Sequence, residues 1–192
     1  MPIEPTATPP VTKTRALLDV PEMASLAIQL LHTNTAVHAF SADDARAVLP
    51  YLRLVNAPRG AQLFVEGDRQ HNSHMLLILE GEVSVDVNEG PGAEQVPVSV
   101  VGPGQLLGEL ALLDDAPRSA TCVAVTDVRA AGLSRQGLQQ LIEQQPRLGA
   151  HLMLAIAQRV GERLRALGDQ LRLYSRLTAE QQDTINRLRA GR

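Results

Sequence analysis

Residues 108–123 read GELALLDDAPRSATCV and form the most informative stretch of this chain. The stretch places the carboxylate of Glu109 nine residues before the guanidinium of Arg118, with a short apolar segment between them. Ser119 adds a small hydroxyl next to the guanidinium. A carboxylate accepts hydrogen bonds from sugar hydroxyls, and a guanidinium binds phosphate through paired hydrogen bonds. The stretch therefore indicates a ligand that carries both a sugar and a phosphate.

The composition is that of a globular protein with an aliphatic core. The 192 residues suit one domain with extensions, and 44% of them are hydrophobic, whereas only 2% are aromatic. So few aromatic residues argue against stacking platforms for single-stranded nucleic acid. The net charge of −3 argues against general polyanion binding, although nine arginines and four acidic residues follow Pro146. This basic segment is either a solvated or paired helical surface or a docking site for an acidic partner or nucleic acid.

Catalytic and metal-binding patterns are missing from the sequence. Cys122 is the only cysteine, which excludes an intrachain disulfide and a cysteine-rich metal site. His71 and His74 have no evident third ligand, so we interpret them as a surface loop, and no catalytic triad spacing occurs. We expect no enzyme activity and no cofactor. No apolar run approaches 18 residues and no apolar signal segment begins the chain, which predicts a cytoplasmic protein without membrane contact.

Helices are predicted on both sides of a β-rich region. Four prolines among the first ten residues predict a disordered leader over residues 1–20. The hydroxyl of Ser41 is a helix cap, and Asp43 and Asp44 favour the positive end of the helix that follows it. Pro146 opens the longest helix, since proline suits a first helical position. The predicted helices span residues 21–33, a segment from 41, 135–143 and 146–174.

Short β segments fill the region between Tyr51 and Leu133. Residues 83–87 read VSVDV and alternate between apolar and polar, which predicts a strand with one buried face. Residues 88–94 predict a long hairpin tip. Many short strands at this spacing indicate a sandwich or barrel. The predicted strands span residues 51–55, 62–65, 75–79, 82–87, 96–101, 121–125 and 128–133.

The longest predicted helix carries a narrow apolar seam. Its apolar positions recur every three or four residues, close to a heptad spacing, which requires a partner surface. We expect the first part to pack on the β-rich domain and the later part on a second copy of the chain. Thr178 and Gln181 form a capping-box pattern that predicts a separate final helix. The seam consists of Met153, Ile156, Val160, Leu164, Leu167, Leu171 and Tyr174.

The order of these elements around GELALLDDAPRSAT resembles the cyclic nucleotide-binding domain family over residues 40–173. Further matching features are Gly60, the turn at residues 64–68, the LEGEV sequence at residues 79–83 and the Pro103-Gly104 pair. Leu107 stands where the family often has phenylalanine. The resemblance implies an α+β fold: an antiparallel, jelly-roll-like β-roll with N-terminal helices and a long C-terminal helix. It places the domain at residues 21–174, followed by a short helical tail at residues 175–192.

The resemblance also implies a pocket for a 3′,5′-cyclic nucleotide, cAMP or cGMP. Glu109 then accepts a hydrogen bond from the ribose 2′-hydroxyl, and Arg118 neutralises the cyclic phosphate. Gly108 permits close approach of the backbone, and a helix that begins beside it offers free N–H groups to the phosphate. A structural ion pair between Glu109 and Arg118 is the alternative. The predicted ligand-binding residues are Gly108, Glu109, Leu110, Ala111, Arg118, Ser119 and Arg163.

The sequence leaves open which base the pocket selects and how binding is signalled. Arg163 and Leu164 face the purine by their register from Pro146, but Arg163 suits a solvated helix surface equally well. Ser119 is compatible with both adenine and guanine. The 18 residues after Tyr174 are too few for a helix-turn-helix reader, so we expect no DNA binding. We expect a homodimer, formed through the long helix, that signals to an unknown protein effector. The alternative is a dimeric scaffold with an empty pocket or one that takes a cyclic dinucleotide.

Overall fold

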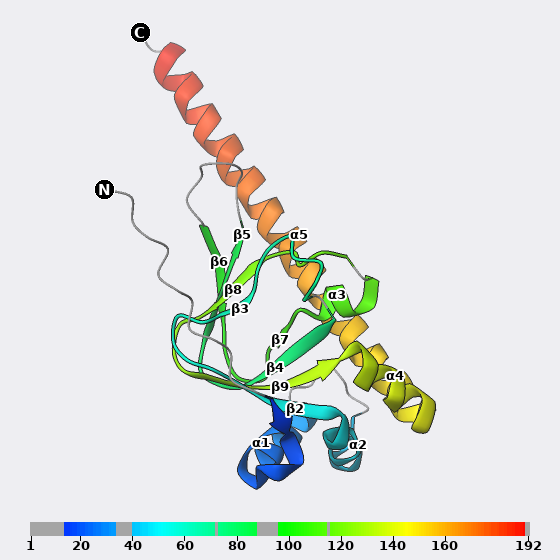
Figure 1. Cartoon of the computed structure of the whole chain (residues 1–192). Helices are drawn as coiled ribbons and strands as arrows, with labels where there is room; N and C mark the ends of the chain where they lie inside the picture. Colours follow the sequence, from blue (N-terminus) through cyan, green and yellow to red (C-terminus); the bar gives the residue numbers. More distant parts are fainter. Residues whose placement is uncertain (1–13, 34–39, 72, 88–95, 115, 191–192) are drawn as a thin grey trace, which may run out of the picture.

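The structure, a computed structural model, describes residues 14–33, 40–71, 73–87, 96–114 and 116–190. Two antiparallel sheets form a β-roll with helices at one end and a long helix along one side, which confirms the predicted α+β fold (Figure 1). The predicted hairpin tip at residues 88–94 lies outside the described residues. One sheet has the order β1 (Arg15–Ala16), β2 (Leu52–Ala57), β9 (Val128–Ser134), β4 (His74–Glu80) and β7 (Leu106–Leu107). The other has the order β3 (Gln62–Phe64), β8 (Thr121–Ala124), β5 (Val83–Val87) and β6 (Val96–Val101).

Strand β4 separates two hydrophobic cores. Met75, Leu77 and Leu79 belong to the core between the five-stranded sheet and the helices. Leu76 and Ile78 belong to the core inside the β-roll. Successive side chains of a strand point to opposite faces, so a strand buried on both sides needs a continuous apolar run. The sequence MLLIL at residues 75–79 meets this requirement.

The helices begin close to where the sequence predicts. At the start of α2, the Ser41 hydroxyl accepts a hydrogen bond from the Asp44 N–H, and the Asp44 carboxylate accepts one from the Ser41 N–H, both at 3.0 Å. This reciprocal cap satisfies two backbone donors that the helix itself leaves unpaired. The helices are α1 (Pro21–Thr33), α2 (Ala42–Val48), α3 (Glu109–Asp114), α4 (Arg135–Gln144) and α5 (Pro146–Ala190), with short 3-10 helices η1 (Leu17–Asp19) and η2 (Leu49–Tyr51).

The prediction of disorder over residues 1–20 is wrong for the described residues 14–20. Residues 15–16 form β1 at the edge of the five-stranded sheet, and Leu17 is fully buried in the helix-side core. The prolines that predicted disorder all lie within residues 1–13, outside the described part. Burial of Leu17, with Val20 packed on the same core, therefore anchors this segment, because burial of apolar side chains offsets the entropy of ordering a few residues.

Replacing Leu17 with alanine is expected to lower the free energy of unfolding by about 2–5 kcal/mol, since a buried leucine is lost without collapse of the site. Urea titration followed by circular dichroism measures this change. Leu18→Ala is the matched control, because the Leu18 side chain is 49% exposed and its loss leaves no internal cavity. Equal effects of the two substitutions would contradict the anchoring role of Leu17.

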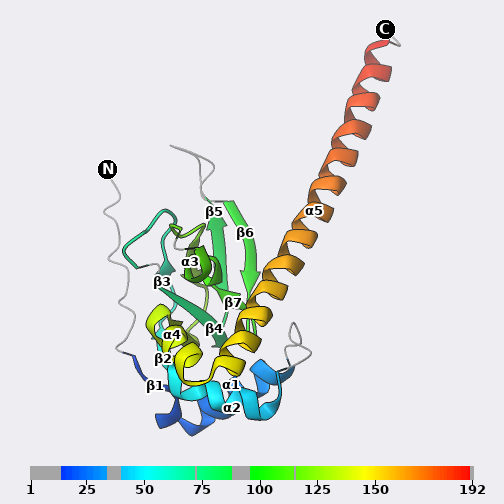
Figure 2. The ribbon, with the colours of Figure 1, turned by 90° about the vertical axis from the view of Figure 1, so that its right-hand side faces the viewer.

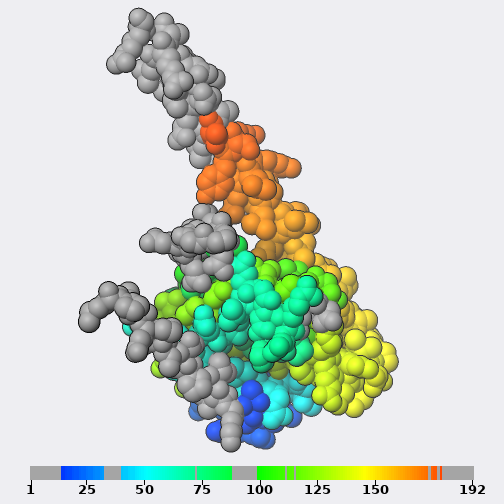
Figure 3. Space-filling view, turned by 45° about the horizontal axis from the view of Figure 1, so that its top comes forward, coloured from blue at the N-terminus to red at the C-terminus, as the bar shows by residue number. Residues whose placement is uncertain are grey.

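Helix α5 differs from the predicted helix ending near Tyr174. It continues without a break from Pro146 to Ala190, so the predicted separate helix at the tail is wrong. The Thr178 hydroxyl donates a hydrogen bond to the Tyr174 carbonyl one turn earlier, so it does not cap a new helix. The C-terminal half of α5 projects away from the β-roll (Figure 2). In the space-filling view, the orange part of α5 extends beyond the β-roll (Figure 3).

The two halves of α5 have different surroundings. Leu148, Leu152 and Ile156 are buried in the helix-side core, which confirms that the first part packs on the domain. The later seam residues are exposed: Leu164 by 70%, Leu167 by 44%, Leu171 by 67% and Tyr174 by 67%. Within the described part of the chain, no helix combines the length and hydrophobicity needed to cross a membrane.

Candidate functional site

Arg118 is the centre of the site and is almost completely buried, with 4% of its surface exposed. Its Nη1 donates a hydrogen bond to the Gly108 carbonyl at 3.0 Å. Its Nη2 donates to the carbonyls of His71 at 2.9 Å and His74 at 2.7 Å. The guanidinium carbon lies 3.8 Å from the centre of the Phe64 ring, within cation–π distance. Three carbonyls and one ring therefore fix the guanidinium in place.

The turn after β3 positions the backbone of Arg118. The Gly67 N–H donates to the Arg118 carbonyl at 2.8 Å, and the Arg118 N–H donates to the Asp68 carbonyl at 3.0 Å. The Asp68 carboxylate in turn accepts hydrogen bonds from the N–H groups of Gln70 and His71. The turn at residues 64–68 is thus the part of the fold that presents Arg118 to the inside of the β-roll.

No carboxylate in the described part of the chain pairs with the charge of Arg118. None of the ion pairs formed by the described residues includes it, and its Nε is buried without a hydrogen-bond acceptor. Burial lowers the pKa of Arg118 from its usual value, while Cys122, Asp68 and Glu109 act in the opposite direction. A guanidinium nevertheless stays protonated in proteins. A buried cation with an unused donor is what an anionic ligand needs.

Gly108 leaves space for this arrangement. Its φ angle is +73°, a left-handed conformation that other residues rarely adopt. A Cβ atom at this position would overlap the Arg118 Nη1 and contact the Phe64 ring too closely. Any side chain at position 108 would therefore displace the guanidinium that forms the site.

Glu109 is the first residue of α3 and is also buried. Its carboxylate lies 3.7 Å from the Arg163 Nη1 of α5. The alternative of a structural ion pair between Glu109 and Arg118 is wrong, because Arg163 is the partner. The pair is long and Arg163 is about half exposed, so a buried carboxylate here has capacity for further hydrogen bonds.

The structure brings the predicted residues together around one cavity of about 390 Å³, part of it open to solvent. The backbone of Ala111 lies in α3, but its side chain is outside the described part. Leu164 is 70% exposed and does not line the cavity, and its contact with a purine stays a prediction. The predicted residues that line the cavity are Gly108, Glu109, Leu110, Arg118, Ser119 and Arg163.

A second, wider cavity of about 800 Å³ adjoins the first and shares Glu109 and Arg163 with it. Four further polar residues line it: Ser99, Gln105, Arg159 and Glu162. None of these four residues was predicted from the sequence. Arg159 is one helical turn before Arg163 and could have been found from that spacing. No signal in the sequence places Ser99, because its position depends on the packing of β6 against α5.

Cys122 and the two histidines give no sign of catalysis or metal binding. Burial raises the pKa of the Cys122 thiol to about 12, so it stays protonated and is a poor nucleophile. His71 is exposed and its ring bonds to Asp68, as a surface loop predicts. His74 is not a loop residue but begins β4, with its ring 5.3 Å from the Phe64 ring. The described residues contain no cluster of three metal-ligating side chains.

His74 is expected to make stability fall as the pH is lowered from 6.5 to 4. Burial first, and then the positive charge of Arg118, lowers the pKa of His74 to about 4. In this pH range the unfolded chain binds a proton at His74 and the folded chain does not, which favours unfolding by up to about 3 kcal/mol. Urea titrations at pH 7 and 4.5 measure how much the free energy of unfolding changes between these two pH values. His74→Gln is expected to flatten this pH dependence, and His71→Gln to flatten it much less, because the charge of His71 is the smallest of the three causes that lower the pKa of His74. Equal pH dependence in all three proteins would contradict the assignment.

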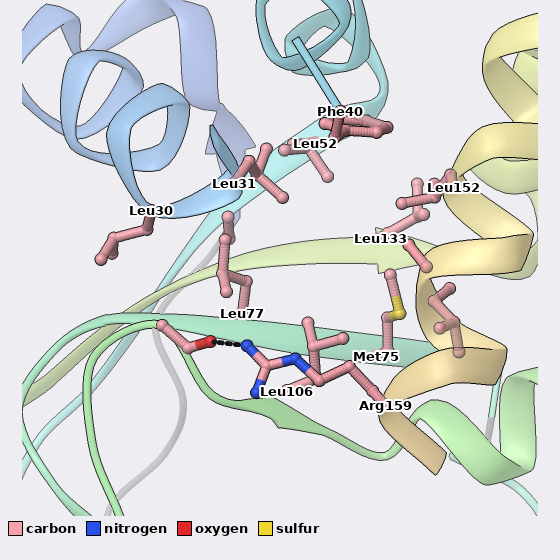
Figure 4. A pocket seen from close by; sticks show the side chains of 14 residues that line it. Leu30, Leu31, Phe40, Leu52, Met75, Leu77, Leu106, Leu133, Leu152 and Arg159 are labelled. Atoms are coloured by element: carbon pink, nitrogen blue, oxygen red, sulfur yellow. Dashed lines mark hydrogen bonds between the residues drawn. The ribbon is translucent and has the colours of Figure 1, made fainter. Parts of the chain in front are cut away.

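A third cavity lies between α1, the five-stranded sheet and α5 (Figure 4). Its walls are apolar except for Arg159, and they include Leu31, Leu77 and Leu152. Arg159 donates a hydrogen bond to the Gly104 carbonyl at 3.1 Å, drawn as the dashed line in Figure 4. This cavity has no carboxylate to accept a hydrogen bond from a sugar, so it does not suit a nucleotide.

Comparison with known proteins places residues 54–145 in a family described as the cyclic nucleotide-binding domain. A solved cyclic nucleotide-binding domain from Methylobacillus flagellatus is 32% identical with a TM-score of 0.69, over 78% of this chain and 82% of that chain. The catabolite activator protein of Thermus thermophilus is 31% identical with a TM-score of 0.61, over 72% of this chain and 62% of that chain.

A curated relative is the CRP-like cAMP-activated global transcriptional regulator of Mycobacterium tuberculosis, which is 29% identical over 59% of this chain and 50% of its own length. Another is the cAMP-dependent protein kinase regulatory subunit of Colletotrichum orbiculare, 42% identical over 60% of this chain and 26% of its own length. The chain thus spans half or less of these two curated relatives. The shared fold, the family match and the similarity over most of a solved domain show that the chain belongs to the cyclic nucleotide-binding domain family.

Proposed function

We propose that the protein is a receptor for a 3′,5′-cyclic nucleotide. The observation that carries this proposal is the buried Arg118 cation, which has an unused Nε donor and no carboxylate partner among the residues that the structure describes. A cyclic phosphate brings one negative charge into such a site. Charge-assisted hydrogen bonds from a guanidinium to phosphate are strongest where water is excluded.

Glu109 supports the sugar part of the proposal. It shares the cavity with Arg118, and it is a buried carboxylate whose ion pair with Arg163 is long. The ribose 2′-hydroxyl is free in a 3′,5′-cyclic nucleotide and donates to such an acceptor. The names of the relatives, a cAMP-activated regulator and a cAMP-dependent kinase regulatory subunit, support the same ligand class.

We further propose that α5 joins two copies of the chain and transmits the effect of ligand binding. The exposed seam from Leu164 to Tyr174 has a heptad-like spacing and projects beyond the β-roll, where a second copy has room to pack (Figure 2). Arg163 lies on the same helix and pairs with Glu109, so a ligand at Glu109 changes a contact that holds α5. Ligand binding would then alter the dimer or a protein partner bound to it.

Isothermal titration calorimetry of the full chain with cAMP and with cGMP tests the proposal. We expect saturable binding of at least one of the two at micromolar concentrations. Absence of heat with both nucleotides up to high micromolar concentration, confirmed by an unchanged melting temperature, would overturn it. If only a cyclic dinucleotide raises the melting temperature, the ligand is a cyclic dinucleotide and the proposal of a 3′,5′-cyclic mononucleotide is overturned.

A further inference from the structure

A fourth cavity, of about 1180 Å³ and partly open to solvent, lies at one end of the β-roll. Strands β2, β9 and β4, which are neighbours in the five-stranded sheet, form its floor. Val55 and Leu76 in this floor belong to the core inside the β-roll, so the cavity opens from the inner face of the sheet. Its lining shares no residue with either of the cavities that contain Glu109. It is therefore separate from the proposed nucleotide site.

Gly132 leaves a hollow in the floor of this cavity. The strand register places it directly between Arg53 of β2 and Leu76 of β4. A Cβ atom at position 132 would lie 3.3 Å from side-chain carbons of Leu76 and Val55, which is closer than an ordinary contact. Glycine inside a strand weakens the sheet and is often found where a ligand approaches the backbone closely. A gap one side chain wide therefore separates a cationic residue from an apolar one.

Two hydrogen bonds hold Arg53 at the edge of the cavity. Its Nε donates to the Thr14 hydroxyl and its Nη2 to the Thr14 carbonyl, both at 3.2 Å. Among the described residues, no acceptor bonds to its Nη1. A side chain that is already fixed loses little conformational entropy when a ligand binds. Arg53 is thus a preorganised donor that can still form further hydrogen bonds.

The described lining of the cavity contains no acidic side chain, and Arg53 is its only arginine or lysine. The Ser134 hydroxyl accepts a hydrogen bond from the Gly137 N–H at 3.0 Å, which leaves its own proton to donate. Burial, together with the charge of Arg118, lowers the pKa of His74 to about 4, so this ring is neutral at pH 7. One guanidinium balances one negative charge and matches the two oxygens of a carboxylate. The lining therefore favours a carboxylate over a doubly charged phosphate.

We propose that this cavity binds a small organic carboxylate with a flat apolar body. The carboxylate pairs with Arg53 and accepts hydrogen bonds from hydroxyls at the edge of the cavity, among them that of Ser134. The apolar body lies over Gly132, in the gap beside Val55 and Leu76. Small-molecule sites commonly combine apolar walls with a few polar groups that fix the orientation of the ligand.

Saturation-transfer NMR titrations of the full chain with benzoate test this site. Benzoate carries both features, whereas acetate lacks the apolar body and benzyl alcohol lacks the charge. We expect a benzoate dissociation constant below about 1 mM, and binding of the other two compounds that is weaker by about 10-fold or more. Arg53→Gln should weaken benzoate binding about 10-fold, as expected for the loss of a charge-assisted pair. Gly132→Ala should weaken it about 3-fold or more, because the added methyl group fills part of the gap.

Arg129→Gln is the matched control, because Arg129 lies on β9 of the same sheet, pairs with Glu80 and does not line the cavity. It should leave benzoate affinity unchanged. Circular dichroism establishes that each variant is folded, and Arg53→Gln carries the test because Arg53 is exposed. Unchanged benzoate affinity in Arg53→Gln, as expected if benzoate binds at Arg118 instead, would overturn the proposal. Binding of benzoate no tighter than that of acetate, or no saturable binding up to about 10 mM, would also overturn it. Each of these outcomes leaves the receptor proposal standing, since calorimetry with the cyclic nucleotides tests that separately.

Discussion

Replacing Arg118 with alanine is expected to weaken cyclic nucleotide binding on the order of 100-fold or more. The substitution removes the buried cation in the proposed phosphate site, and removing one partner of a buried charge-assisted contact has effects of this size. Calorimetry with the better-binding nucleotide measures the loss. Arg118→Lys keeps the charge but not the forked donor geometry, so we expect an intermediate affinity.

Folding of the Arg118 variants needs a separate measurement, because the guanidinium also bonds to three backbone carbonyls. Circular dichroism and urea titration establish whether Arg118→Lys is folded, and this variant then carries the test. Arg46→Ala is the matched control, since Arg46 is exposed on α2 and pairs with Asp43. Affinity equal to the unaltered protein in both Arg118 variants would show that the phosphate does not bind here.

Replacing Leu167 and Leu171 together with glutamate is expected to convert a dimer into monomers. The two leucines are 44% and 67% exposed in the isolated chain, and the proposed dimer buries both of them in each copy. Burial of a leucine contributes about 1.5 kcal/mol or more, so four leucines contribute roughly 6 kcal/mol, or about four orders of magnitude in the dissociation constant. Sedimentation equilibrium over a range of protein concentrations measures this change.

The control for this double substitution is Leu154→Glu. Leu154 is also an exposed leucine of α5, at 53%, but it does not belong to the heptad-like seam. We expect it to leave the dimer unchanged. A chain that is already monomeric at high micromolar concentration would contradict the dimer proposal, and so would a dimer that survives the double substitution.

Most elements of the fold follow from local patterns in the sequence. The run MLLIL predicts a strand, the Ser41 cap predicts a helix, and the bounds of α1 and β6 match their predictions. The predictions that are wrong concern segments whose structure depends on residues distant in the sequence. Leu17 orders its segment by entering a core formed by residues far along the chain. The tail continues α5 because a capping pattern only permits a helix start and does not force one.

The site also contains residues that could be predicted from local sequence and residues that could not. Gly108, Glu109, Arg118 and Ser119 lie within a dozen residues, so their place around a short helix could be predicted. The places of Ser99, Gln105 and Glu162 could not be predicted, because the cavity that they line exists only where β6 packs beside α5. The role of Phe64 under the guanidinium likewise depends on the pairing of β3 with β8.

The sequence by itself therefore determined the β-roll, the long helix and the residue types that suit a sugar and a phosphate at residues 108–123. The tertiary structure decided which groups face one another. It directs Arg118 onto the carbonyls of His71 and His74, more than 40 residues away in the sequence. It also pairs Glu109 with Arg163 of α5. The physical reason is that hydrogen bonds and burial act over a few ångströms, and only the fold brings such distant residues within that range.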